Sequence, residues 1–343
     1  MRELLGTLYV TTQDAVLRLD HDTVRVIVER ETLARLPLVR LQAIMVFGRV
    51  TVTTPLIHRC AEDGRGLVWL TRRGRFRARL TGGTLGNVLL RRAQYEALAD
   101  PERTRRLARQ CVAGKVQNAR TLMLRAARDS PAEEDGEELR AGADRLAGLL
   151  REIREATDLD VLRGLEGTAA RAYFAAFPSM VRADQPAFTL GGRNRRPPRD
   201  RTNALLSFCY ALLRAECEAA LEGVGLDPQL GYLHGLRPGR PALALDLMEE
   251  LRPAFADRLV LRVINRRQIR AGHFDHMPGG AVSLNEEGRR ATLSAYEKRK
   301  ESAVPHRLLK ERIPAGLVPH VQARLLARHL RGDLQHYLPY LAS

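Results

Sequence analysis

The feature that most constrains the fold is a change of hydrophobic period near residue 83. Up to about residue 82, apolar residues recur at every second position, which is typical of half-buried strands. Beyond it they recur with the 3.6-residue period of amphipathic helices, and the Gly-rich segment 81–86 separates the two patterns. We therefore expect an α+β protein. A small β-sheet or β-sandwich domain should occupy residues 1–83, and a larger all-α domain residues 84–343.

The same periods predict the individual elements. Strands are expected at residues 5–12, 15–20, 23–29, 43–48, 66–70 and 73–80, with a short helix at 54–62. Helices are expected at residues 87–98, 101–129, 137–155, 159–177, 201–221, 242–255, 285–301 and 319–329. An acidic loop should precede residue 137, and residues 181–199 should form a polar, Pro-rich loop.

The last of these strands places four arginines on one face: Arg73, Arg75, Arg77 and Arg79. At ~3.3 Å of rise per residue their spacing is ~6.6 Å, which is close to the spacing of phosphates along a DNA backbone. A face that binds phosphates and a face that is merely solvated both remain open.

The charge balance favours a nucleic-acid partner. The chain has 56 basic and 40 acidic residues, a net charge of +16, and only four of the basic residues are lysines: Lys115, Lys298, Lys300 and Lys310. The planar guanidinium of arginine suits bidentate contact with phosphate. A skewed genomic base composition would explain the excess of arginine over lysine equally well, but it would not explain the net charge.

The cysteines favour a reducing compartment. Cys60, Cys111, Cys209 and Cys217 form no CxxC pair, so we expect buried free thiols rather than a zinc cluster. The N-terminus lacks the layout of a signal peptide, and no apolar run approaches the ~20 residues of a membrane span. We expect a soluble, cytoplasmic protein.

Segment 231–250 carries the strongest indication of chemistry. His234 precedes a turn with Arg237 and Arg240, and the following helix bears Asp246 and Glu249 among aliphatic residues. A buried carboxylate is costly without a partner. A divalent cation shared with His234 would be such a partner, and the arginines could bring a phosphate to it. Because Asp246 and Glu249 are three positions apart, both could approach one ion.

Glu166 is another carboxylate on a helix face that otherwise predicts core packing. Its neighbours three and four positions away are Leu162, Arg163, Ala169, Ala170 and Tyr173. A salt bridge to Arg163 or Arg171 would explain it, and so would a role as a ligand in the site of His234. Two carboxylates and one imidazole suit Mg²⁺ or Mn²⁺ better than zinc.

Alternatives to this site remain. Taken alone, His234 could be an ordinary loop histidine with a hydrogen-bond partner. His273 and His276 are spaced closely enough to suggest a metal site, but they stand beside a Met-Pro-Gly-Gly turn and form the weaker candidate.

A second basic segment runs into the helix expected at residue 201. It contains five arginines: Arg193, Arg195, Arg196, Arg199 and Arg201. Prolines stiffen the segment, and Asp200 or Thr202 can cap the helix. Positive charge beside a helix N-terminus favours phosphate binding, although a solvated run of charge is the alternative.

Several of these segments match a known family in order and spacing. They are residues 165–167, 195–198, 203–207, 231–250, 265–268, 296–300, 322–324 and 331–333. Over essentially its whole length the chain resembles the CRISPR-associated spacer integrase, the nuclease subunit of the CRISPR adaptation complex. It most resembles the subtype C branch of type I systems.

The resemblance implies a metal site, partners and a reaction. The family's ligands for Mg²⁺ or Mn²⁺ fall on Glu166, His234 and Glu249, which would be the catalytic residues, and Asp246 would be an accessory acid or an alternative third ligand. The β domain would contact DNA and form a homodimer. Two dimers would flank a dimer of a small ferredoxin-fold subunit in a heterohexamer. One departure is Gly272-His273-Phe274, where the family has an acid before the phenylalanine.

We therefore expect a metal-dependent DNA endonuclease and integrase. The 3′-hydroxyl of a prespacer would attack a phosphodiester of the CRISPR repeat in double-stranded DNA. Arg237 and Arg240 would hold the phosphate, while Arg193, Arg195, Arg196 and Arg199 would follow the flanking duplex. The rival interpretations are a DNA-binding scaffold without catalysis and a metal-dependent hydrolase of a small phosphate ester, which the net charge disfavours.

Overall fold

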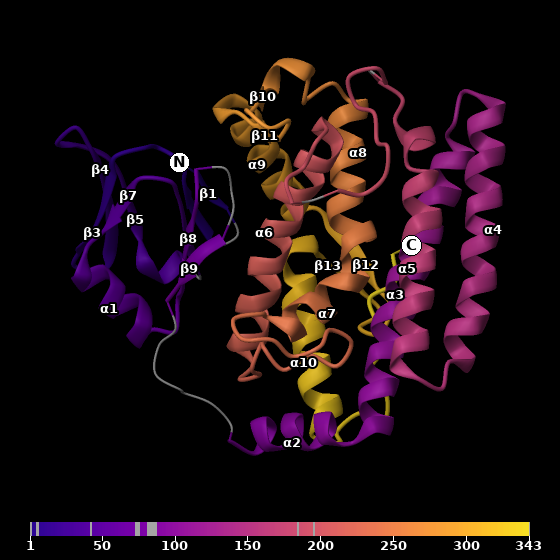
Figure 1. Ribbon diagram of the computed structural model, residues 1–343. Coiled ribbons are helices and arrows are strands. Elements are labelled where there is room, and N and C mark those ends of the chain that lie inside the picture. The colour runs from indigo at the N-terminus through magenta and orange to yellow at the C-terminus, as the bar shows by residue number, and fades with distance from the viewer. Residues whose placement is uncertain are drawn as a thin grey trace. The chain divides into compact units, whose positions relative to one another are not determined.

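The computed structural model describes residues 2–4, 7–41, 43–72, 76–80, 88–183, 185–194 and 196–342. It divides into two compact units, Met1–Gly86 and Asn87–Ser343 (Figure 1). The smaller unit is built of β-strands and the larger of helices, so the predicted α+β fold class is confirmed.

Two sheets form the smaller unit. One has the order β1-β2-β6-β8-β9, from Arg2–Leu4, Thr7–Val10, Ala43–Phe47, Gly66–Leu70 and Phe76–Arg79. The other has the order β5-β4-β3-β7, from Glu31–Pro37, Thr23–Val28, Ala15–Asp20 and Val50–Val52. The helix α1 (Thr54–Glu62) separates β7 from β8, and a 3-10 turn, η1 (Leu38–Arg40), precedes β6.

The two sheets share one apolar core. In β3 and β4 alternate residues are buried, for example Leu17, Val24 and Val26. These side chains belong to a single cluster with Ile44 of β6 and Leu56 of α1. The period-two pattern of the sequence is thus the inward-facing row of β3 and β4, whereas Ile44–Phe47 of β6 are buried without alternation.

The arginine-bearing strand is described only in part. Arg77 and Arg79 lie in β9, which pairs antiparallel with β8, and Arg77 is exposed. Arg73 and Arg75 lie outside the described residues.

Helices dominate the larger unit. They are α2 (Val88–Ala99), α3 (Pro101–Arg128), α4 (Glu133–Glu155), α5 (Leu159–Ala175), α6 (Arg201–Gly223), α7 (Ala242–Leu251), α8 (Arg258–Asn265), α9 (Glu286–Glu301) and α10 (Val318–Leu330). In Figure 1, α3 lies beside α4 and α5, while α6, α7 and α10 form the neighbouring layer. Among the described residues, no helix combines the length and the apolar character that a membrane crossing requires.

Caps fix several helix starts. The side chain of Asp100 accepts hydrogen bonds from the backbone N–H groups of Glu102 and Arg103 at the start of α3. Asp200, rather than Thr202, caps α6 by accepting from the N–H of Asn203 at 2.7 Å. These side chains satisfy N–H groups that have no partner within the helix.

The structure also differs from the expected elements. Helix α4 begins at Glu133, so the acidic residues assigned to a loop form its first turn, where carboxylates are favoured by the helix dipole. The helical unit is not purely α, because it contains the hairpins β10–β11 (Phe274–His276, Val282–Leu284) and β12–β13 (Ala303–His306, Glu311–Pro314). Strands β5 and β7 and helix α8 were not expected either.

The expected helix at 242–255 contains a change of geometry. The regular helix α7 ends at Leu251, and a π-helical segment, η3 (Arg252–Asp257), joins it to α8. Pro253 has no N–H to give to the carbonyl four residues earlier, which accounts for a wider turn here. Such segments re-aim side chains within an otherwise continuous helix.

Close packing joins α3, α7 and the C-terminal segment. A Cβ atom on Gly114 would lie 2.6 Å from Cβ of Pro339 and 3.1 Å from Cβ of Glu250, so only glycine fits there. Asn118, one turn further along α3, donates from Nδ2 to the carbonyl oxygens of Glu250 at 2.7 Å and Tyr340 at 2.8 Å. The backbone of α7 is thereby held against α3.

Glu250 is a fully buried carboxyl in this packing. Its Oε1 accepts hydrogen bonds from Gln322 Nε2 at 2.7 Å and the Tyr337 hydroxyl at 3.0 Å. Burial raises the pKa of Glu250 to about 8, although both hydrogen bonds lower it. The folded protein therefore holds a proton that the unfolded chain, with an ordinary carboxyl pKa of 4.5, releases.

This proton makes stability depend on pH. Between about pH 4.5 and pH 8 the folded state binds more protons than the unfolded state, so the free energy of unfolding falls as pH rises, by at most about 1.4 kcal/mol per pH unit from this group. The change Glu250→Gln should flatten that slope and make the variant at least as stable as the parent at about pH 8. Urea unfolding across this pH range measures it, with the exposed Glu134→Gln on α4 as control. A slope unchanged by Glu250→Gln would contradict the assignment.

Candidate active site

The loop that carries His234 lies close against the start of α7. A Cβ atom on Gly231 would lie 2.6 Å from the carbonyl carbon of Ala242, so glycine is required for this approach. Further along, the N–H of Arg240 donates to the carbonyl of Arg237 at 3.0 Å, and Gly239 has a φ of +71°. Proline followed by glycine at the centre of such a turn is the type II pattern.

Asp246 holds this loop in place. Its Oδ2 accepts from the backbone N–H groups of Tyr232 at 2.6 Å and Leu233 at 2.9 Å, and its Oδ1 accepts from the N–H of His234 at 3.0 Å. The side chain is buried. Three backbone donors compensate for the cost of burying this carboxylate.

Asp246 also orients the imidazole of His234. The ring Nδ1 lies 2.6 Å from Asp246 Oδ1, and because a carboxylate only accepts, Nδ1 carries the proton. The other ring nitrogen, Nε2, faces Glu249, whose Oε1 lies 3.9 Å away. Carboxylates that hold histidines in this way are typical of metal sites, where they fix the tautomer of the ligand.

Lys115 of α3 joins the other two predicted residues. Its ammonium contacts Oε1 of Glu166 on α5 and lies 2.7 Å from Oε2 of Glu249 on α7. Three helices therefore meet at one cation. The salt bridge foreseen for Glu166 exists, but to Lys115 rather than to Arg163 or Arg171. Arg163 instead bonds Asp160 and the carbonyl of Leu233.

The electrostatics keep this cluster charged. Burial alone would raise the pKa of Glu249, but Arg252, Lys115 and His234 lower it to about 2. Burial likewise opposes the charge of Lys115, yet Glu249 and Glu166 hold its pKa above the ordinary value. Glu249 and its neighbour Glu250 thus differ in pKa because only Glu249 faces cations.

The donor set suits a hard divalent ion. Mg²⁺ and Mn²⁺ accept carboxylate oxygens and a histidine nitrogen as ligands. The site offers two carboxylates and Nε2 of His234, whose Nδ1 is already bonded to Asp246. Among the described residues, however, no three His, Cys, Asp or Glu side chains stand close enough together to form a metal-binding cluster. The ammonium of Lys115 lies between the two carboxylates, so a metal could bring them together only if that ammonium moved.

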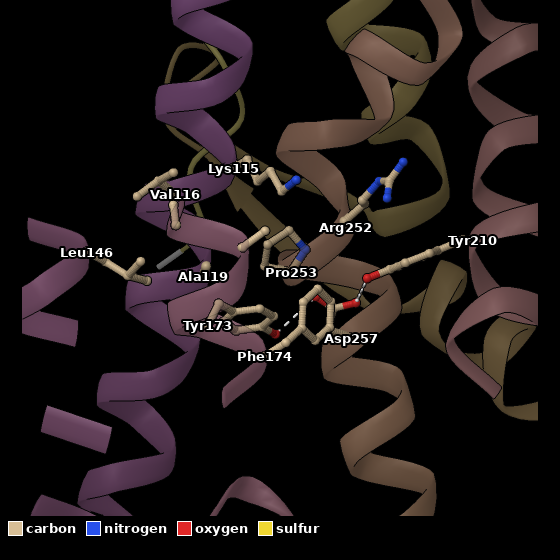
Figure 2. Close-up of a pocket in the computed structure, with 12 residues that line it drawn as sticks. Lys115, Val116, Ala119, Leu146, Tyr173, Phe174, Tyr210, Arg252, Pro253 and Asp257 are labelled. Carbon is tan, nitrogen blue, oxygen red and sulfur yellow. Dashed lines mark hydrogen bonds between the residues drawn. The ribbon is translucent and has the colours of Figure 1, made fainter. Parts of the chain in front are cut away.

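A small cavity adjoins Lys115. It has a volume of about 30 Å³ and is lined by Lys115, Arg252, Tyr173, Tyr210, Asp257 and apolar residues. Figure 2 shows both tyrosine hydroxyls directed at Asp257, to which Tyr210 donates at 2.6 Å and Tyr173 at 3.0 Å. Despite these bonds, burial raises the pKa of Asp257 to about 6.

Arg252 is the second cation on Glu249. Its Nη2 lies 3.0 Å from Glu249 Oε1, and its guanidinium lies 4.7 Å from the centre of the Tyr210 ring. The ring and the carboxylate together fix this side chain.

The predicted DNA-binding arginines fall into different environments. Arg196, Arg199 and Arg237 are exposed and Arg240 is half-buried, whereas Arg195 lies outside the described residues. Arg193 points into the protein, where it donates to Asn203 Oδ1 at 2.6 Å and Ser207 Oγ at 3.1 Å. Its guanidinium lies 5.3 Å from the Tyr210 ring. These contacts join the loop to α6.

The weaker histidine pair does not converge. His273 lies 3.6 Å from Glu287, and His276 Nε2 lies 3.3 Å from Arg201. Each ring therefore has a separate partner.

Sequence reasoning missed Lys115, although a signal was present. Cys111, Val112 and Ala119 occupy the positions three and four residues from it on α3 and are all buried. A lysine on such a face needs a buried anion, just as Glu166 needed a cation. Considering Lys115 and Glu166 together, as two charged residues on apolar helix faces, would have predicted their contact.

Comparison with known proteins reveals relatives over the whole chain. Residues 8–298 match the family model described as CRISPR associated protein Cas1. A relative from Moorella thermoacetica, named CRISPR-associated endonuclease Cas1 1, is 53% identical over 341 residues, which cover 99% of this chain and 99% of the relative.

Solved structures share the fold. A casposase bound to integration product has a TM-score of 0.82 at 20% identity, covering 97% of this chain and 92% of that one. A chain of a Cas6-RT-Cas1–Cas2 complex has a TM-score of 0.83 at 23% identity, covering 100% of this chain and 37% of that one. At these identities the likeness establishes the fold alone.

Proposed function

The chain belongs to the Cas1 family of CRISPR-associated proteins. We propose that it is an endonuclease and integrase and that its chemistry takes place at Glu166, His234 and Glu249. One observation carries this proposal. Two carboxylates from separate helices contact the same cation, and Nε2 of His234 faces one of them at 3.9 Å.

The reaction is a transfer between phosphodiesters of DNA. The 3′-hydroxyl oxygen of a prespacer forms a bond to phosphorus in the CRISPR repeat, and the bond from that phosphorus to the repeat 3′-oxygen breaks. The proton lost by the attacking hydroxyl is balanced by the one gained by the leaving oxygen. When bound, Mg²⁺ or Mn²⁺ would supply Lewis acidity and hold the scissile phosphate.

The residues of the chain have separate tasks. Glu249, with a pKa of about 2, stays ionised throughout the neutral range and can bind a cation without first losing a proton. His234 offers Nε2 because Asp246 occupies Nδ1. Asp246 therefore acts as a positioning residue and not as a third carboxylate ligand.

Exposed and half-buried arginines would contact the DNA. Arg237 and Arg240 flank the turn that follows His234, so they are suited to hold the phosphate next to the reacting one. Arg196 and Arg199 are exposed just before the N-terminus of α6 and would follow the duplex. Arg195 is assigned to the same group from the sequence. The inward contacts of Arg193 suit it to shaping this loop instead.

The proposed partners follow from the family. The structural neighbours include a Cas1–Cas2 complex, and we place this chain in a heterohexamer of two homodimers around a dimer of a small ferredoxin-fold subunit. The β domain, residues 1–83, would form the homodimer and contact DNA. A cytoplasmic location agrees with a DNA substrate and with four buried, unpaired cysteines.

Substitution of the three proposed ligands should separate catalysis from binding. Glu166→Gln, His234→Ala and Glu249→Gln should each lower nicking and strand joining in Mg²⁺ or Mn²⁺ by at least about 100-fold, since loss of groups that merely orient ligands already costs about 10- to 100-fold. Duplex affinity should change by less than about threefold, because the exposed arginines are untouched.

A half-site integration assay with a labelled forked duplex and a repeat-containing plasmid measures the activity. The exposed Asp144→Asn on α4 is the matched control. If these variants join strands as efficiently as the parent protein, the catalytic assignment is refuted. The protein would then act as a DNA-binding scaffold.

Salt dependence should reveal which arginines contact phosphate. Each neutralised phosphate adds about 0.9 to the slope of log affinity against log salt. Replacing Arg196 and Arg199 by glutamine should therefore reduce the slope by up to about 2. Exposed arginines on α4 serve as the control pair, Arg151→Gln with Arg154→Gln, and should leave it unchanged. Equal slopes for the two double variants would mean that Arg196 and Arg199 are only solvated.

A further inference from the structure

Lys115 is placed where a metal would have to bind. Its ammonium contacts both Glu166 and Glu249, and the side chain is only 15% exposed. The neighbouring cation, Arg252, is fixed by Glu249 and by the Tyr210 ring. Both cations border a cavity of about 30 Å³, enough for one or two waters. Lys115 is held by the two carboxylates without the ring contact that also holds Arg252, so Lys115 is the cation that is more easily displaced.

A divalent ion and Lys115 would compete for the same carboxylates. Glu166 and Glu249 both contact the ammonium of Lys115, so an ion that bound them would displace the ammonium. In a poorly solvated site a displaced ammonium is unfavourable unless it gains another anion. The phosphate of a phosphodiester would be such an anion.

Without Lys115 this competition disappears. No ammonium would then hold Glu166 and Glu249, and the site would have one more net negative charge to offer a divalent ion. Affinity for hard divalent ions rises with the negative charge of the ligand set. The lysine therefore weakens metal binding in the absence of DNA, and this penalty is removed when a phosphate enters.

We propose that Lys115 couples metal binding to DNA binding. Without DNA, its ammonium holds Glu166 and Glu249 in place of a metal and opposes the entry of a divalent ion. When a DNA phosphodiester enters, the ammonium moves from the carboxylates to the phosphate, so the metal and the DNA bind together. This inference rests on the function proposed above, and it assigns a regulatory property to the same site.

The test measures Mn²⁺ affinity rather than activity. Free Mn²⁺ is followed by electron paramagnetic resonance during titration of the full chain, with and without a short DNA duplex. For the parent protein, the duplex should tighten Mn²⁺ binding by at least about tenfold. For Lys115→Met, binding without DNA should tighten by at least about tenfold, and the effect of the duplex should shrink to less than about threefold.

Lys298→Met is the matched control, because Lys298 is exposed on α9. It should behave as the parent. Lys115→Arg keeps the charge and should keep the coupling. If Lys115→Met does not fold, Lys115→Gln removes the charge while retaining a donor to the carboxylates, and the same changes in affinity are expected.

Two outcomes separate this inference from the proposed function. If Glu166→Gln and Glu249→Gln abolish Mn²⁺ binding while the uncharged Lys115 variants bind Mn²⁺ as the parent does, with and without DNA, the coupling role of Lys115 is refuted and the metal site stands. If the glutamine variants of Glu166 and Glu249 bind Mn²⁺ like the parent, the metal site itself is refuted, and the coupling with it.

Discussion

The helical unit is organised around the cost of burying carboxylates on one short helix. Asp246, Glu249 and Glu250 of α7 are all buried, and each is compensated differently. Asp246 accepts backbone N–H groups and the His234 ring, Glu249 faces Lys115 and Arg252, and Glu250 retains its proton. These contacts reach α3, α10, the C-terminal segment and the loop before α7. The same contacts that stabilise the helix therefore assemble the site.

The sequence predicted the fold class and much of its layout. When one face of a helix or strand is buried, apolar residues recur with the period of that element, and this period can be read from the local sequence. The strands at Ala15–Asp20 and Gly66–Leu70 and the helix Thr54–Glu62 begin and end where the pattern predicted. The short hairpins β10–β11 and β12–β13 were missed because strands of three or four residues carry too little alternation. The expected helix at 242–255 gave way to a π-helical segment at Arg252, where Pro253 changes the backbone hydrogen bonding without interrupting the apolar pattern.

Only those residues of the site whose type is unusual among their sequence neighbours could be predicted from the sequence. Glu166 and Glu249 stand out as carboxylates on apolar faces, and His234 stands out beside the Pro-Gly turn. The structure brings all three into one region, while their role as metal ligands stays a proposal. The subtype within the family likewise stays a prediction. The place of Lys115 between two carboxylates depends on residues far away in sequence, Glu166 and Glu249. The inward orientation of Arg193 depends on the way its loop folds back on α6. Composition alone made Arg193 look like any other arginine of a basic loop.

The most direct test of the central claim is to locate the metal. Crystals of the full chain grown with Mn²⁺ and a DNA duplex would show the ion by its anomalous scattering. The account predicts a Mn²⁺ peak roughly 2.0–2.6 Å from carboxylate oxygens of Glu166 and Glu249 and from Nε2 of His234, with Nζ of Lys115 displaced onto a phosphate oxygen. A peak bound elsewhere, with Lys115 still between the two carboxylates, would contradict it.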